Sequence, residues 1–561
     1  MKHWSDIIKP RRGLTALFLA EGILAAFLMN YGASVFRTLI DRLTAGTLTA
    51  GAVFLYASVL GLSIVVNYLD EYPSNKLEHG IHLGFKMAAL GKAARIDYQA
   101  YRLLGTGRLV QRIENGAAAG KGIVFEFWFR LAREIVPSIV FSMLFIYRIN
   151  RTVMLTILLG YVLVFFLSNL LLKALYRIKE RILVNEENLN HLLVRGLMEM
   201  VVFRLHKRFP DEIRKASAAG DAIVSAKVRM KMIHEAFFAA FALLILLVKA
   251  AIILFGWRSG AISVGGIVAL VALVDNAYTP VAIFNVLYVQ YRLDRAAFRR
   301  YADFLDLPDD PQLGAGERVE ALSGGFEFDG VRFEYAGQPV FEQLDLSVRS
   351  GESLAFVGES GSGKSTAARL LAGLLKPTAG AIRVDGKALS ALDLDSYYEH
   401  IAYIPQESPV FDGTLRENVG FDRTADDGAI REALEKAGLG DWTDRLADGL
   451  DTPVGERGYR LSGGERQRLA LARLWFSPAR IVILDEATSA LDNVTEEKVM
   501  SNVLERLRGR TVLVIAHRLA AVTGFERIVV FRDGRVLGQG NHERLLEDCP
   551  YYRELVSAGM V

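Results

Sequence analysis

Six long apolar stretches in the first half of the chain limit what it can fold into. They cover residues 14–40, 52–68, 127–147, 153–175, 236–257 and 264–283. A helix of roughly 20 residues is needed to cross the ~30 Å hydrocarbon core of a bilayer. A hydrophobic content of 52% and a mean hydropathy of +0.24 are also high for a purely soluble protein. We therefore expect an all-α membrane domain of six long helices.

The charges between these stretches predict how the domain lies in the membrane. Residues 70–122 and 177–233 are rich in Lys and Arg, which stay on the cytoplasmic side. Both termini are therefore expected in the cytoplasm. Residues 86–114 and 172–231 mix apolar and charged residues at helical spacing, so the membrane helices should continue into the cytosol. Residues 1–12 are too polar for a signal peptide, and we expect the first helix to be a retained anchor.

Overall charge and cysteine content exclude two classes of protein. The chain has 66 basic and 63 acidic residues, so nothing draws it as a whole to nucleic acid. Cys549 is the single cysteine, which excludes a disulfide within one chain. We expect no nucleic-acid partner.

The composition changes near residue 305. Pro308, Pro311, Gly314 and Gly316 indicate a linker. Beyond it, β-branched and aromatic runs alternate with helical ones, as in an α/β fold. The predicted domains are residues 1–305 for the membrane part, 306–325 for the linker and 326–561 for the α/β part.

A glycine-rich turn in the second half has the composition of a phosphate-binding loop. An apolar strand is expected before it and a helix after it, which is the context that such a loop requires. Its backbone N–H groups and the lysine charge would hold the phosphates of a nucleotide, and Ser365 would ligate Mg²⁺. The loop consists of Gly358, Glu359, Ser360, Gly361, Ser362, Gly363, Lys364, Ser365 and Thr366.

Two adjacent carboxylates end a second apolar strand. Residues 481–484 are Ile-Val-Ile-Leu and lead directly to Asp485 and Glu486. Adjacent acids in this position are typical of sites that handle a Mg²⁺-nucleotide. We predict that Asp485 serves the metal, directly or through water, and that Glu486 orients and polarises the attacking water.

With these motifs, the whole chain resembles a half-transporter of the ATP-binding cassette superfamily. The resemblance implies an exporter-type (type IV) transmembrane domain fused ahead of a nucleotide-binding domain. It also implies ATP and Mg²⁺ as cofactors, and ATP hydrolysis coupled to transport across a cell membrane, most simply that of a bacterium. The family's motifs occur in the family's order along the chain.

The resemblance gives further residues their expected roles. Tyr335 matches the aromatic residue that stacks on adenine. Gln406 matches the glutamine that senses Mg²⁺ and the water. His517 matches the switch histidine at the γ-phosphate. Asp492 ends the loop that couples the two sites of a dimer. The signature that caps ATP bound to the partner domain is matched by Ser462, Gly463 and Gly464.

Two departures from the family pattern and two further segments complete the resemblance. The signature ends in Glu465 where the family usually has Gln, and Pro453 stands where exporters usually have Glu. Residues 101–115 resemble the stretch beside the family's first coupling helix. The second coupling helix is expected near residues 203–213.

A lone chain of this kind cannot work, because each ATP is expected to be buried between two nucleotide-binding domains. The second half-transporter is expected to be an identical copy, since the motifs are intact, although a heterodimer is possible. Fold analogy favours export of a small molecule, peptide or lipid. An importer of a metal-siderophore-like compound and a lipid or peptide flippase remain open, and an ATP-gated channel or sensor is the least favoured alternative.

Ionisable residues inside the apolar stretches are the candidates for cargo contacts. Glu126, Arg130 and Glu134 stand four apart and are expected to pair along one helix face. Lys249 and Asp275 could pair between helices or face the cargo. Arg133 has no obvious partner in the sequence and is the favoured cavity residue. Aromatic residues at 125 and 127–129 could stack on cargo, but packing is the simpler expectation.

Overall fold

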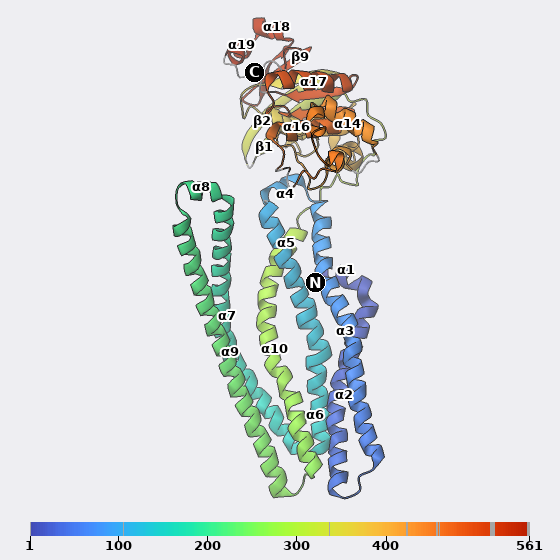
Figure 1. The fold of residues 1–561 in the computed structure, drawn as a ribbon, viewed down its shortest axis with the longest axis vertical. Helices are drawn as coiled ribbons and strands as arrows, with labels where there is room; N and C mark the ends of the chain where they lie inside the picture. The colour runs from blue at the N-terminus through green and yellow to red at the C-terminus, as the bar shows by residue number, and fades with distance from the viewer. Residues whose placement is uncertain are drawn as a thin grey trace. The chain divides into compact units, whose positions relative to one another are not determined.

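A computed structural model describes residues 2–104, 106–335, 337–421, 425–455, 458, 460–516 and 522–557. The chain forms two compact units (Figure 1). The first comprises Met1–Ala94 and Leu104–Leu307, and the second comprises Arg95–Leu103 and Pro308–Val561. The second unit thus includes a short segment from within the predicted membrane domain.

The first unit consists of helices, and six of them are long. The third long helix is continuous from 106 to 149 but changes from α to π geometry in its middle. The predicted class, six long helices followed by an α/β domain, is confirmed. The helices are α1 (Lys2–Ile8), η1 (Lys9–Arg11), α2 (Arg12–Thr44), α3 (Ala50–Ala93), α5 (Thr106–Lys121), η2 (Gly122–Phe129), η3 (Leu131–Ile135), α6 (Val136–Ile149), α7 (Arg151–Met198), α8 (Met200–Leu205), α9 (Phe209–Ser259) and α10 (Val264–Leu305).

Within the described residues, four helices are long and apolar enough to cross a membrane by length and composition. They are Trp4–Thr44, Ala50–Ala93, Phe209–Ser259 and Val264–Leu305. The predicted span 127–147 lies in the helix that π turns divide. The predicted span 153–175 lies in α7. The chain is a multi-pass membrane protein.

Short helices connect the long ones where coupling helices were expected. The connection between α3 and α5 contains α4 (Tyr98–Leu104), and α8 joins the neighbouring helices α7 and α9 (Figure 1). The range predicted for the second coupling helix, 203–213, overlaps only the end of α8 and continues into α9. α9 begins at Phe209, within the range predicted for the coupling helix. A helix can begin here because Pro210 is tolerated in a first helical turn.

Buried polar contacts join the helices of the first unit. The Asn30 side chain is fully buried in α2, and its Oδ1 accepts hydrogen bonds from Ser142 of α6 at 2.9 Å and Asn276 of α10 at 3.3 Å. Tyr161 of α7 donates to the Ala277 carbonyl at 2.8 Å. Buried polar atoms in a helix bundle need such partners, so these bonds fix which faces meet.

Two sheets form the second unit. The six-stranded sheet has the order β10-β9-β3-β8-β7-β6, and the other has the order β2-β1-β4-β5. Pairing in the six-stranded sheet is parallel except between β9 and β10. The strands are β1 (Phe326–Tyr335), β2 (Gln338–Val348), β3 (Ser353–Val357), β4 (Ala379–Val384), β5 (Lys387–Ala388), β6 (Ile401–Ile404), β7 (Ile481–Asp485), β8 (Thr511–Ile515), β9 (Arg527–Arg532) and β10 (Arg535–Gly540).

The strand order decides where the site lies. β7 and β8 are buried throughout, as expected for parallel strands covered on both faces. The carboxyl ends of β3, β7 and β6 share one edge of the sheet, so the segments that follow them meet there. The helices of this unit are α11 (Lys364–Leu371), α12 (Leu394–Tyr398), α13 (Leu415–Gly420), α14 (Asp427–Lys436), α15 (Gly440–Thr443), α16 (Gly463–Ala472), α17 (Asn493–Arg506), α18 (His542–Asp548) and α19 (Pro550–Ser557).

Candidate active site

The glycine-rich turn links β3 to α11 as the sequence predicts. Gly358, Gly361 and Gly363 have φ values of 146°, 86° and 106°, which an L side chain rarely adopts. A Cβ on Gly358 would also fall onto the carbonyl oxygen of Phe531. These glycines therefore let the backbone turn tightly enough to leave its N–H groups for a ligand.

Lys364 extends over this loop. Its Nζ donates hydrogen bonds to the carbonyl oxygens of Gly358 at 2.7 Å and Glu359 at 2.8 Å. Burial lowers the pKa of Lys364, while the carboxylates of Glu486, Asp485 and Glu359 oppose that shift. The loop thus holds a buried cation at the helix start, where a phosphate would supply its counter-charge.

Ser365 and Asp485 meet at the edge of the sheet. The Ser365 hydroxyl donates to Asp485 Oδ1 at 2.7 Å, and the Asp485 side chain is buried. A hydroxyl and a carboxylate are hard oxygen donors of the kind that Mg²⁺ prefers. The residues therefore fit the predicted metal.

Glu486 follows the buried strand β7 in a left-handed conformation, with a φ of 53°. Non-glycine residues in this region are strained and are often found in active sites. The Glu486 N–H donates to the Ile515 carbonyl at 3.1 Å, and Gln406 Nε2 donates to Glu486 Oε2 at 2.6 Å. The two side chains predicted to handle the attacking water are thus in direct contact.

A cavity of about 910 Å³ lies over these groups. Its lining includes several of the predicted site residues, together with Ile515 of β8 and Ala516 after it; Asp485 is not among the described lining residues. A volume in the range of ~300–1,000 Å³ is typical of small-molecule sites. The lining includes Tyr335, Ser360, Gly361, Gly363, Lys364, Ser365, Thr366, Gln406 and Glu486.

The signature residues lie elsewhere. Ser462 caps α16, and Ser462, Gly463 and Gly464 are not among the described residues that line the cavity. The Ser462 N–H donates to Glu465 Oε2 at 2.7 Å, and the Glu465 N–H donates to Ser462 Oγ at 3.3 Å. This reciprocal capping box gives the departure at Glu465 a local structural role.

The loop that ends at Asp492 is hydrogen-bonded to the signature helix α16. Gln467 accepts a hydrogen bond from the Ala490 N–H at 2.8 Å and donates to Ser489 Oγ at 3.0 Å. Asp492 caps α17 through the Thr495 N–H at 3.0 Å and is likewise absent from the described cavity lining. His517 lies outside the described residues, although Ala516 before it lines the cavity.

Comparison with known proteins matches this geometry to a family. The family model described as ABC transporter matches residues 341–489. The solved structure of a bacterial Atm1-family ABC exporter with ATP bound superposes with a TM-score of 0.82, covering 99% of each chain at 23% identity. Residues 341–489 are therefore an ABC transporter domain. This domain is the ATP-binding ATPase part of the chain, and the helical unit has the exporter fold.

Curated relatives of this cassette protein agree. An ATP-dependent lipid A-core flippase of Bordetella avium is 28% identical over 95% of this chain and 93% of its own length. An uncharacterized ABC transporter ATP-binding protein of Bacillus subtilis is 38% identical, and a lipid A-core flippase of Ralstonia nicotianae is 42% identical. These two matches span only about half of the relatives' length, at 52% and 43%.

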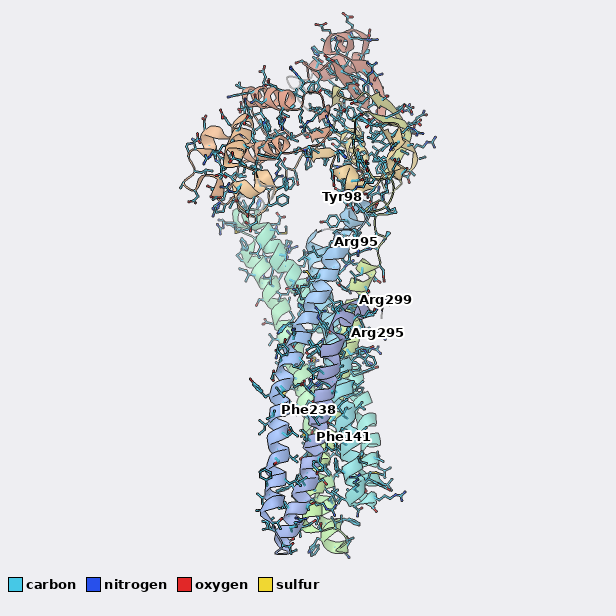
Figure 2. The ribbon with its side chains drawn as sticks, turned by 90° about the vertical axis from the view of Figure 1, so that its right-hand side faces the viewer. Arg95, Tyr98, Phe141, Phe238, Arg295 and Arg299 are labelled. Carbon is cyan, nitrogen blue, oxygen red and sulfur yellow. The ribbon has the colours of Figure 1, made fainter. Side chains whose placement is uncertain are left out.

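The cassette domain also binds the segment Arg95–Leu103, whose Arg95 and Tyr98 are labelled in Figure 2. Ile96 is buried and forms a bridge with Asp309, and Tyr98 packs against the core below β1. Lys376 pairs with Asp310 at 2.6 Å and with Asp97 at 3.6 Å. The compact unit that contains the cassette domain therefore also includes a segment from within the predicted membrane domain.

Arg102 of this segment reaches the predicted adenine-stacking residue. Its guanidinium lies 5.3 Å from the centroid of the Tyr335 ring, whose edge packs against Phe333 at 4.9 Å. Sequence reasoning missed Arg102, because only the fold brings residue 102 beside residue 335.

The charged residues of the helical unit are paired more fully than the sequence suggested. The expectation that Arg133 lacks a partner is wrong: its Nη2 lies 2.6 Å from Asp70 Oδ2 of α3, and its guanidinium lies 3.8 Å from the Phe18 ring centroid. Lys249 and Asp275 do pair between helices, at 2.7 Å. These contacts leave the cargo role of the three residues a prediction.

The predicted ladder along the third helix is half correct. Arg130 pairs with Glu134 at 2.9 Å, but Glu126 lies nearest Lys121, at 4.0 Å. Glu126 lies in the π-helical stretch Gly122–Phe129, and Lys121 and Glu126 are five residues apart, which is the spacing of a π turn. The aromatic residues here pack as expected, with Phe125 stacked on Phe18 at 5.3 Å and Phe127 on Tyr291 at 4.3 Å.

Proposed function

We propose that this chain is one half of an ATP-driven transporter that exports an amphipathic or polar organic cargo by alternating access. The observation that carries the proposal is the cavity that unites Lys364, Ser365, Gln406 and Glu486, in a chain that also has a helical unit with the exporter fold. The solved structure of a bacterial ABC exporter supports export from a bacterial cell. The Lys- and Arg-rich segments between the apolar stretches favour a cytoplasmic cassette domain.

The chain's own residues divide the work of hydrolysis. Lys364 and the loop amides hold the phosphates, and Tyr335 stacks on the base. Ser365, Asp485 and Gln406 would hold Mg²⁺, which neutralises phosphate charge when bound. Glu486, held by Gln406, accepts a proton from the attacking water, and its left-handed backbone directs the carboxylate into the cavity.

The location of the signature supports a dimer. Gly463 and Gly464 lie in the first turn of α16, where backbone N–H groups have no partner within the helix and can attract a phosphate. Among the described residues, Ser462, Gly463 and Gly464 do not line the chain's own cavity. A second chain would present its signature to this cavity and receive the reciprocal contact. We propose a homodimer, because each chain carries a complete motif set, and a heterodimer is the alternative.

Lipid export is the more specific candidate for the cargo. It is favoured by the lipid A-core flippase of Bordetella avium, which aligns with this chain over almost its whole length. A cargo of this class has an anionic head and apolar tails, so it would enter the helical unit from the bilayer. The alternative function, import of a metal-siderophore-like compound, moves cargo in the opposite direction. One experiment therefore distinguishes import from export.

Sided transport in sealed vesicles tests the proposal. The full chain is reconstituted with its cassette domain outward, and ATP is added outside together with a fluorescent lipid or amphipathic compound. Export from the cytoplasm predicts ATP-dependent accumulation inside the vesicle, and Glu486→Gln vesicles serve as the control. ATP-dependent loss of preloaded cargo would indicate import, and movement equal in the control would refute the pump.

A further inference from the structure

Tyr403 contacts the metal-site carboxylate from the side opposite Ser365. Its hydroxyl donates a hydrogen bond to Asp485 Oδ2 at 2.9 Å, while Ser365 donates to Oδ1 at 2.7 Å. Both oxygens of a buried carboxylate are therefore held, one from β6 and one from α11. No motif in the sequence assigns a role to Tyr403.

Strand register explains how the tyrosine reaches this position. β6 pairs in parallel with β7, and Tyr403 is opposite Ile483. Alternate residues of a strand share one face, so Ile483 and Asp485 point the same way as Tyr403. The ring crosses from β6 along that face, packs against the core and ends at the carboxylate.

Arg369 of α11 lies beside the tyrosine hydroxyl and interacts electrostatically with it. A guanidinium has only donors, so beside it the Tyr403 oxygen is an acceptor and the hydroxyl proton stays available for Asp485.

We propose that Tyr403 is a positioning residue that restricts Asp485 to a single oxygen toward the metal and thereby favours Mg²⁺ over Ca²⁺. Mg²⁺ demands compact octahedral geometry, whereas Ca²⁺ accepts both oxygens of one carboxylate. Oδ2 accepts from Tyr403, and Oδ1 is the oxygen that lies beside Ser365, a residue that lines the cavity. The inference rests on the proposed function to the extent that Asp485 serves a metal-nucleotide.

A nucleotide-binding cycle tests this role without relying on turnover. The affinity of the full chain for a non-hydrolysable ATP analogue is measured in EDTA, in Mg²⁺ and in Ca²⁺. The affinity in Mg²⁺ divided by the affinity in EDTA is the Mg²⁺ ratio, and the Ca²⁺ ratio is defined in the same way. Each ratio gives the contribution of that metal to nucleotide binding. Loss of a residue that orients a metal ligand typically weakens metal binding about 10–100-fold. For Tyr403→Phe we expect the Mg²⁺ ratio to fall about 10-fold, the Ca²⁺ ratio to fall less, and affinity in EDTA to stay unchanged.

Tyr397→Phe is the matched control. Tyr397 lies in the same domain, is fully buried, and donates a hydrogen bond from its hydroxyl to the Leu371 carbonyl at 2.8 Å. Removing this hydroxyl therefore reproduces any general loss of domain stability that Tyr403→Phe causes. It should leave both metal ratios unchanged. The inference would be overturned if the Mg²⁺ ratio and the Ca²⁺ ratio of Tyr403→Phe were each the same as in the wild type. A wild-type chain whose nucleotide affinity ignores Mg²⁺ would instead refute the metal role of Asp485 itself.

Discussion

In the cassette domain Lys364, Gln406 and Glu486 all line one cavity, whereas in the helical unit Arg133 and Lys249 each contact a carboxylate of a neighbouring helix. The first set is held together by backbone geometry around a space for a ligand. In the second set, each basic side chain is neutralised by the carboxylate that it contacts. The comparison teaches that an ionisable residue in an apolar stretch is a weak guide to a cargo site until its partner is known, because pairing removes the cost that suggested function.

The largest effect should come from the cassette domain. Glu486→Gln keeps the size of the side chain but removes the base, so we expect ATP turnover to fall about 10²–10⁴-fold while ATP still binds. Phosphate release and nucleotide binding, measured on the same preparation, check this. Near-normal turnover would mean that Glu486 is as structural as the pairs in the helical unit.

The next effect should come from the Arg133 and Asp70 pair. Both side chains are largely buried, at 15% and 18% exposure. Removing one partner of a buried pair typically costs about 3–5 kcal/mol, and we expect Arg133→Ala to lie near the lower end because some exposure remains. Thermal unfolding of the purified chain gives the change in stability.

The double variant Arg133→Ala with Asp70→Asn sharpens that result. Coupled residues deviate from additivity by about 0.5–3 kcal/mol, so the double variant should be more stable than the sum of the single losses predicts. Strict additivity would separate the two side chains energetically. If Arg133→Ala lost only the stimulation of ATP turnover by cargo and kept normal stability, the result would support a role of Arg133 in cargo binding.

A smaller effect is expected at the signature. Glu465→Ala removes half of the capping box and should cost about 1 kcal/mol of stability, whereas Glu465→Gln keeps an acceptor oxygen and should cost less than about 0.5 kcal/mol. Thermal unfolding of both variants checks the order. If the two variants were equally destabilised, the charge rather than the cap would matter.

The smallest effect should be at Arg130. Its pair with Glu134 lies along one helix, and the side chains are 39% and 47% exposed. Such pairs contribute about 0.2–0.5 kcal/mol, so Arg130→Ala should barely shift the unfolding midpoint. A loss as large as that of Arg133→Ala, three residues away, would contradict the distinction between the two pairs.

The sequence predicted the parts of the site that are local in the chain. The loop at 358–366 needs only its glycines, a strand before it and a helix after it, and Asp485 and Glu486 need only the strand that precedes them. Tyr403, Arg369 and Arg102 could not be found in this way. Their roles depend on strand order, strand register and the packing of segment 95–103, none of which leaves a local pattern.

By itself, the sequence determined that six helices precede an α/β domain and which residues form its phosphate loop, because hydrophobic length and glycine conformations are properties of consecutive residues. Tertiary structure alone decided that Arg133 pairs with Asp70, that Glu126 pairs with Lys121 in a π-helical stretch, and that Tyr403 reaches Asp485. These contacts join residues far apart in the chain or depend on the geometry of the helix, and their energies exist only once the elements are packed.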